Sequence, residues 1–208
     1  MRAQIQGVHA IGGCGMTNIF LDCETTGLNH HKNRTLVVAV VITDDHMEEI
    51  WNREYRITCT NPDCIDPKAL EVNGIDIAKH NKAANKEHEV VGKMNHEITE
   101  MLRKRKELVG DDFVRIIGHN VSFDMRFIDA MYVRNQTLRM WDGHIEDTKN
   151  LAQQMTNRGR ITFRDHKLET VAARFAYPGT KFHDAMADVR ATIFIYQRMK
   201  EYENMGAL

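Results

Sequence analysis

Short apolar runs separated by turn-forming residues dominate the first third of the chain. Ile19 to Glu24, Arg34 to Thr43 and Glu49 to Thr58 have the length and the apolar or alternating character of β-strands, with Asp44-Asp45 as a turn between the last two. This pattern predicts a meander of three antiparallel strands. The first strand is apolar enough to lie centrally in a sheet.

The pattern changes to helical spacing after Pro62 and Pro67. A short helix is predicted for Lys68 to Val72, and apolar residues recur every three or four positions from Glu87 to Leu108. Strands are then predicted at Phe113 to Gly118 and His144 to Asp147, and helices at Ser122 to Asn135 (capped by Ser122), Thr148 to Met155, Leu168 to Phe175 and Ala185 to Tyr202. Strands first, then alternating strands and helices, predict a single α/β domain with a mixed five-stranded sheet flanked by helices.

The length of 208 residues fits one domain. Residues 1–16 are punctuated by glycine and lack a steady period, so we expect an N-terminal extension that is poorly ordered, followed by the domain at 17–208. The longest apolar run, Leu36 to Ile42, is far shorter than the ~20 residues that cross a bilayer, and we expect no membrane partner.

The net charge and the cysteine spacing each exclude a class of function. The 28 basic and 29 acidic residues give a net charge of −1, which excludes a protein that coats nucleic acid through its overall field but leaves local recognition of a nucleic-acid end open. The four cysteines, Cys14, Cys23, Cys59 and Cys64, form no C-x-x-C pair. We therefore expect reduced thiols, a cytoplasmic location and no zinc site.

Two carboxylates end the first predicted strand. Strand side chains alternate, so Asp22 and Glu24 point to the same face. Like charges side by side repel unless a cation lies between them, and oxygen ligands suit Mg²⁺ or Mn²⁺. A solvated strand end is the simpler reading of this pair taken alone.

Two further segments carry candidate chemistry. Asp124 falls in the first turn of a helix that follows Gly118-His119-Asn120, where it could equally compensate the helix dipole. His183 precedes the last helix and Asp188 lies one turn into it. A histidine can take a proton from water at neutral pH, although a surface histidine beside a capping aspartate is the simpler reading of this segment alone.

The order of the three segments resembles the DEDDh exonucleases, a DnaQ-like family with an RNase H-like fold that includes polymerase proofreading subunits. The matching segments are Asp22-Cys23-Glu24-Thr25-Thr26-Gly27-Leu28, Asn120 to Asp124, and His183 to Asp188, with Asp147-Thr148 as a further echo. The resemblance implies a 3′-to-5′ exonuclease that releases nucleoside 5′-monophosphates. It covers about residues 17–202.

The resemblance also implies roles for individual residues. Two divalent ions, Mg²⁺ or Mn²⁺, would be held by Asp22, Glu24, Asp124 and Asp188, with His183 as general base. Thr25, Thr26 and Leu28 would cradle the terminal nucleotide, and Asn120 would lie near the substrate. Two such ions would stabilise both the attacking and the departing oxygens of a phosphodiester.

The expected partner is a nucleic-acid 3′ end, single-stranded or frayed DNA in preference to RNA. An exoribonuclease of the same catalytic type and a non-catalytic module that binds nucleic-acid ends are the alternatives. Asn73-Gly74 stands where family members often carry His-Gly, and few residues follow Tyr202, so a polymerase partner is not implied. The basic loop from Arg158 to Lys167 is either solvated or in contact with nucleic acid.

Overall fold

Strand β1 (Gly15–Thr25) lies in the middle of a five-stranded sheet whose order is β3-β2-β1-β4-β5. A computed structural model describes residues 15–110 and 112–205. The other strands are β2 (Thr35–Thr43), β3 (Glu49–Arg56), β4 (Asp112–Gly118) and β5 (His144–Asp147). β1, β2 and β3 pair antiparallel, and β4 and β5 add parallel to β1, which confirms the predicted mixed sheet and the central place of the first strand.

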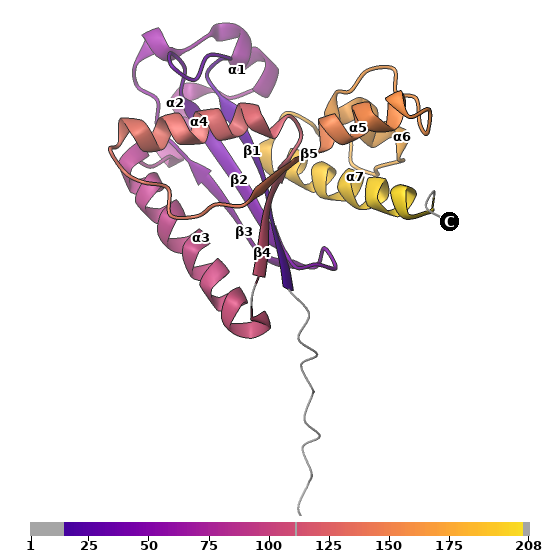
Figure 1. The fold of residues 1–208 in the computed structure, drawn as a ribbon. Helices are drawn as coiled ribbons and strands as arrows, with labels where there is room; N and C mark the ends of the chain where they lie inside the picture. The colour runs from indigo at the N-terminus through magenta and orange to yellow at the C-terminus, as the bar shows by residue number, and fades with distance from the viewer. Residues whose placement is uncertain (1–14, 111, 206–208) are drawn as a thin grey trace, which may run out of the picture.

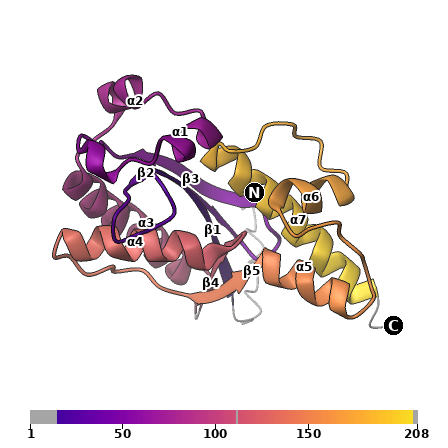
Figure 2. The ribbon, with the colours of Figure 1, turned by 90° about the horizontal axis from the view of Figure 1, so that it is seen from above.

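Helices cover both faces of this sheet (Figure 1; Figure 2). They are α1 (Pro67–Asn73), α2 (Ile77–Ala83), α3 (Glu87–Val109), α4 (Val121–Arg134), α5 (Thr148–Asn157), α6 (Leu168–Arg174) and α7 (Ala185–Met205), with a 3₁₀ turn at Pro62–Cys64. Helices α3 and α4 pack on one face, and α7 packs on the other with α5 and α6 beside it. Within residues 15–110 and 112–205, no helix is long and apolar enough to cross a bilayer.

The alternation of β1 divides its side chains between the two layers. Ile19, Leu21 and Cys23 join the core beneath α3 and α4, whereas Phe20 joins the core beneath α7. By the same alternation Asp22 and Glu24 face the α7 side. Helices cover both faces of β2, so all nine of its residues are buried. This burial explains the unbroken apolar run in the sequence.

Three local predictions differ from the structure. β1 begins at Gly15, four residues before the predicted start, so the predicted extension overlaps it at Gly15 and Met16; residues 1–14 lie outside the described residues. Ser122 does not cap α4, because that helix begins one residue earlier, after Asn120 in a left-handed conformation. Helix α2 was not predicted, because its seven residues are too few to show a clear apolar period. The helix begins at a cap, in which the Asp76 side chain accepts from the N–H groups of Ala78 and Lys79.

Truncation of Phe20 tests the two-sided burial of β1. Its ring is fully buried and meets Tyr196 of α7 edge-on at 5.6 Å between centroids. Phe20→Ala should therefore lower the free energy of unfolding by roughly 3–5 kcal/mol, measured by urea denaturation. Leu138→Ala is the control, since that side chain is 82% exposed and should cost less than about 0.5 kcal/mol. Equal losses for the two variants would contradict this account of the core.

Candidate active site

Three carboxylates meet at the carboxyl end of β1. Asp22 and Glu24 come from the strand, and Asp188 comes from the first turn of α7, which packs across the same face. Each offers one oxygen, and the three oxygens all lie within 4.8 Å of one another. The structure thus brings together three of the residues that the sequence singled out in distant segments.

Burial makes this cluster electrostatically costly. Desolvation, reinforced by the neighbouring carboxylates, raises the pKa of Glu24 to about 7 and holds the pKa of Asp22 well above its usual range. Desolvation likewise raises the pKa of Asp188 to about 6. A hydrogen bond from Asn73 partly offsets the shift at Glu24.

The donor set fits a hard divalent cation. Carboxylate oxygens are the ligands that Mg²⁺ and Mn²⁺ prefer, and a bound cation would remove the repulsion that raises these pKa values. Asp188 supplies a second indication, because its Oδ1 is buried without a hydrogen-bond partner among the described residues. A buried acceptor left unpaired is unfavourable unless something else, such as an ion, satisfies it.

Asp124 lies beside the cluster and not within its closest set of oxygens. It is 3% exposed, and its Oδ1 accepts a 3.0 Å hydrogen bond from the backbone N–H of Cys23, between the two carboxylates of β1. Desolvation raises its pKa, and its charge in turn raises the pKa of Asp22. Asp124 therefore ties α4 to the strand that carries the site.

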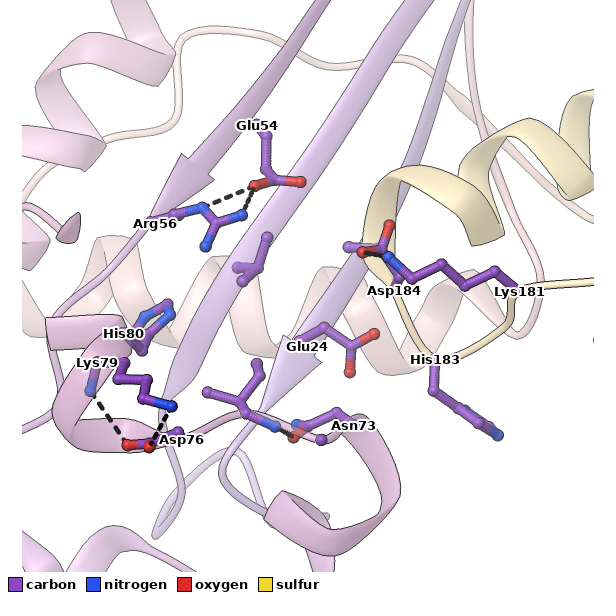
Figure 3. A pocket seen from close by; sticks show the side chains of 14 residues that line it. Glu24, Glu54, Arg56, Asn73, Asp76, Lys79, His80, Lys181, His183 and Asp184 are labelled. Carbon is purple, nitrogen blue, oxygen red and sulfur yellow. Dashed lines mark hydrogen bonds and ion pairs between the residues drawn. The ribbon is translucent and has the colours of Figure 1, made fainter.

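His183 stands at the entrance to α7 with its backbone in the left-handed region, at φ 60°. Its N–H donates to Asp188 Oδ2 at 3.2 Å, which fixes the turn relative to the carboxylates. Figure 3 shows its imidazole pointing away from Glu24. The ring lies along the walls of two cavities that flank the site.

The two threonines and Leu28 of the first segment have separate environments. Thr26 is fully buried, and its hydroxyl donates to the Cys64 carbonyl and accepts from the Arg34 N–H, so it supports the loop from beneath. Thr25 is 7% exposed and donates to the Gly27 carbonyl. Leu28 is 83% exposed, and no apolar core covers it.

An apolar cavity of about 320 Å³, the α1 cavity, opens beside the carboxylates. Leu28 and Phe123 line it from β1's loop and from α4, and Ala69 and Val72 line it from α1. Phe123 also packs against Phe127, with 4.9 Å between ring centroids. The apolar period of the sequence places Phe123 on the core stripe of the predicted helix, and its position one residue before Asp124 was the signal of a place in the site.

A network of hydrogen bonds next to the cluster involves His119, Asn120 and Asp147. Asp147 Oδ1 accepts from the Asn120 N–H and from the Lys149 N–H, so one carboxylate joins the start of α4 to the start of α5. His119 bonds Thr148 Oγ1 and the His166 carbonyl, each at 2.9 Å. The hydrogen bond between Asp147 and Asn120 gives a structural role to the Asp147-Thr148 segment. The local sequence pattern alone did not indicate that role.

Asn73 occupies the position where the sequence departs from the family pattern. It donates to the Thr25 carbonyl at 3.2 Å and accepts from the Ile75 N–H at 3.1 Å. Its amide also bonds Glu24. Asn73 therefore orients a carboxylate of the cluster and closes the turn after α1, a role that its position on a polar turn did not reveal.

Comparisons with known proteins identify the family of this chain. The family model RNase_T, described as Exonuclease, matches residues 19–196. A DNA polymerase III PolC-type of Staphylococcus aureus is 28% identical over 203 residues, covering 92% of this chain and 12% of the relative, and that of Bacillus subtilis is 27% identical over 188 residues, covering 88% and 11%. The chain thus spans about a tenth of the length of these curated relatives.

Solved structures show the same fold. Escherichia coli exonuclease I, in a zinc-bound complex with single-stranded DNA, superposes with a TM-score of 0.74 at 21% identity, covering 89% of this chain and 42% of that one. Exonuclease I of Methylocaldum szegediense superposes with a TM-score of 0.69 at 20% identity, covering 91% and 41%. The predicted fold is confirmed.

Unfolding with and without metal tests the carboxylate cluster. Glu24 and Asp188 have folded-state pKa values of about 7 and 6, raised above their ordinary 4.5 and 3.8, so the stability they contribute is complete below about pH 4 and is lost as pH rises through 7. A divalent cation should restore it at high pH, while protons compete at low pH. Mn²⁺ at 10-fold to 100-fold excess over its Kd at pH 8 should raise the free energy of unfolding at pH 8 by about 1.4–2.7 kcal/mol. At the same Mn²⁺ concentration, the accompanying rise in Tm should be smaller at pH 5.

The double variant Glu24→Gln, Asp188→Asn is the control for that measurement. It keeps the shapes of both side chains and removes both charges, so its Tm should no longer respond to Mn²⁺ at either pH. An equal metal response at both pH values in the unsubstituted protein would contradict the cluster as the metal site.

Proposed function

Because the chain belongs to the exonuclease family, we propose that it hydrolyses the terminal phosphodiester at the 3′ end of single-stranded or frayed DNA and releases nucleoside 5′-monophosphates. The convergence of Asp22, Glu24 and Asp188 within 4.8 Å carries the proposal. The direction of cleavage follows from the family resemblance of the three segments. The preference for DNA follows from the relatives, which are DNA polymerases, and from the exonuclease I complex with single-stranded DNA.

Asp22, Glu24 and Asp188 would hold a divalent cation, Mg²⁺ or Mn²⁺, with Asp124 placed to help position a second. Such ions supply neutralisation of the phosphodiester and stabilisation of charge as it develops. The protein's own part is geometry. β1 and α7 present the carboxylates together, and the hydrogen bonds from the Cys23 and His183 backbones keep Asp124 and Asp188 oriented toward the cluster.

The terminal nucleotide would place its base in the α1 cavity. Leu28 and Phe123 offer apolar surface on which a base can stack, and Val72 closes the side formed by α1. Glu24 and Asn73 also line this cavity, so a base held there sets its sugar and phosphate beside the carboxylates. Thr25 and Asn120 would approach the same nucleotide, whereas the buried hydroxyl of Thr26 serves the loop.

His183 would act as the general base. It belongs to the turn that is tied to Asp188, so a rotation about its side-chain bonds moves the imidazole without displacing the carboxylate. Once turned toward the cluster, the ring can take a proton from the attacking water at neutral pH.

A gel time course with 5′-labelled DNA and RNA oligomers of one sequence, in Mg²⁺, Mn²⁺ or EDTA, tests the activity. We expect a ladder that shortens by one nucleotide at a time from the 3′ end, is absent in EDTA and forms faster on DNA. Asp22→Ala should leave below about 1% of the rate, because it removes a shared ligand. Asp142→Ala is the matched control, since that side chain is 85% exposed and pairs with Arg139 in the loop before β5, and its loss should leave the rate unchanged.

Each departure from that result has a defined meaning. Faster shortening of the RNA oligomer would overturn the preference for DNA. A folded protein that forms no ladder in any metal, yet binds the 3′ end equally in EDTA, would replace the enzyme by a binding module.

The pH profile of His183→Ala tests the general base. Loss of the imidazole should lower kcat by about 10²-fold and should remove the rise of the rate with pH near neutrality. His46→Ala provides a comparison, because that histidine is exposed beside Asp45 in the turn between β2 and β3 and its loss should leave the pH profile unchanged. An unchanged pH profile in His183→Ala would end its role as base.

A further inference from the structure

Two polar cavities share His183 as a lining residue, and their charges are arranged differently. One, the β3 cavity, has a volume of about 510 Å³ and is lined by residues of β3, α2 and the turn before α7 (Figure 3). The other, the α5 cavity, has a volume of about 590 Å³ and is lined by residues of α5, the start of α6 and Asn120. His183 lines both, and Glu24 lines the β3 cavity, so both cavities adjoin residues of the candidate active site.

Every basic residue of the β3 cavity other than histidine is neutralised by a carboxylate. Arg56 pairs with Glu54 at 2.6 Å and Lys181 with Asp184 at 2.6 Å. Lys79 pairs with Asp76 at 3.6 Å. Glu24 adds a further carboxylate to the same wall, so this cavity has no surplus of positive charge to offer a polyanion.

The α5 cavity has the opposite arrangement. Lys149 and Lys167 line it, and among the described residues no carboxylate lies within ion-pair distance of either ammonium group. Lys149 is half-buried, which strengthens its attraction for an anion relative to a fully solvated lysine. Glu169 is the one carboxylate among the lining residues.

Neutral hydrogen-bonding groups complete this wall. Gln153 lies one helical turn after Lys149, on the same face of α5, and Asn120 lies at the end nearest the carboxylates. Val72 of α1 lines both the α5 cavity and the α1 cavity, so the two are neighbours across one side chain. A strand whose last base fills the α1 cavity can therefore continue into the α5 cavity past Val72.

We propose that the substrate strand upstream of the scissile phosphodiester lies in the α5 cavity, with its phosphates against Lys149 and Lys167. This inference rests on the proposed exonuclease function and adds the route of the strand to it. Lys167 is the last residue of the basic loop that the sequence singled out. Arg158 and Arg164 of that loop pair with Glu203 and Asp165, and Lys167 is the lysine or arginine of the loop that lines the α5 cavity.

Kinetics on a deoxythymidine decamer and on the dinucleotide dTpT test the route. The dinucleotide holds the scissile phosphodiester but no upstream phosphate. In the double variant Lys149→Gln, Lys167→Gln, the KM for the decamer should rise roughly tenfold. The slope of log KM against log salt should fall by about 0.7 for each lysine removed. The ratio of kcat/KM on the decamer to that on the dinucleotide should fall with it.

Lys79→Gln is the matched control, because it removes one lysine from the β3 cavity and should leave KM, salt slope and ratio unchanged. An unchanged KM and salt slope for the decamer in the double variant, with its Tm intact, would overturn the route. A larger effect in Lys79→Gln than in the double variant would overturn it in favour of the β3 cavity. If the unsubstituted protein shortens no decamer at all, the proposed function itself fails, which is distinct from a wrong route.

Discussion

Repulsion among three carboxylates at the end of β1 is the constraint on which the rest of the structure depends. Asp22, Glu24 and Asp188 are held within 4.8 Å of one another in a half-buried place, and desolvation raises all three pKa values. Such a cluster persists only where other contacts leave the backbone no alternative. Burial of β1 on both faces, with neighbouring strands on both edges, provides that restraint.

Hydrogen bonds then orient the carboxylates around the end of this strand. The Cys23 N–H fixes Asp124, the His183 N–H fixes Asp188, and Asp147 joins the starts of α4 and α5. Each contact links the site to a different element. The carboxylates are therefore positioned by hydrogen bonds that cross between layers, and the apolar cores beneath them keep those layers in register.

The sequence predicts the strands and longer helices well, because their apolar periods are local. It also predicts that Asp22 and Glu24 share a face, since side chains two positions apart on a strand point to the same side. The meeting of Asp188 with that pair depends on how α7 packs across the sheet, and no local spacing contains it; here the family resemblance supplied what periodicity could not. The roles of Asn73 and Asp147, and the burial of Thr26, depend on hydrogen bonds between distant segments and appear only in the folded chain.

The distribution of ion pairs matters more for a polyanion than the net charge does. A chain of net charge −1 offers a polyanion no long-range attraction, and the carboxylate cluster repels phosphate at close range, so attraction has to come from cations close to the substrate. In the β3 cavity Arg56, Lys79 and Lys181 are each matched by a carboxylate, which cancels their field within a few ångströms. In the α5 cavity, neither Lys149 nor Lys167 forms an ion pair with a carboxylate of residues 15–110 and 112–205, although Glu169 shares the lining and the charge of Lys167 helps to lower the pKa of Asp165. Each cavity contains two lysines, ion-paired in the β3 cavity but not in the α5 cavity among the described residues, and this difference would favour approach of the proposed substrate strand along the α5 cavity.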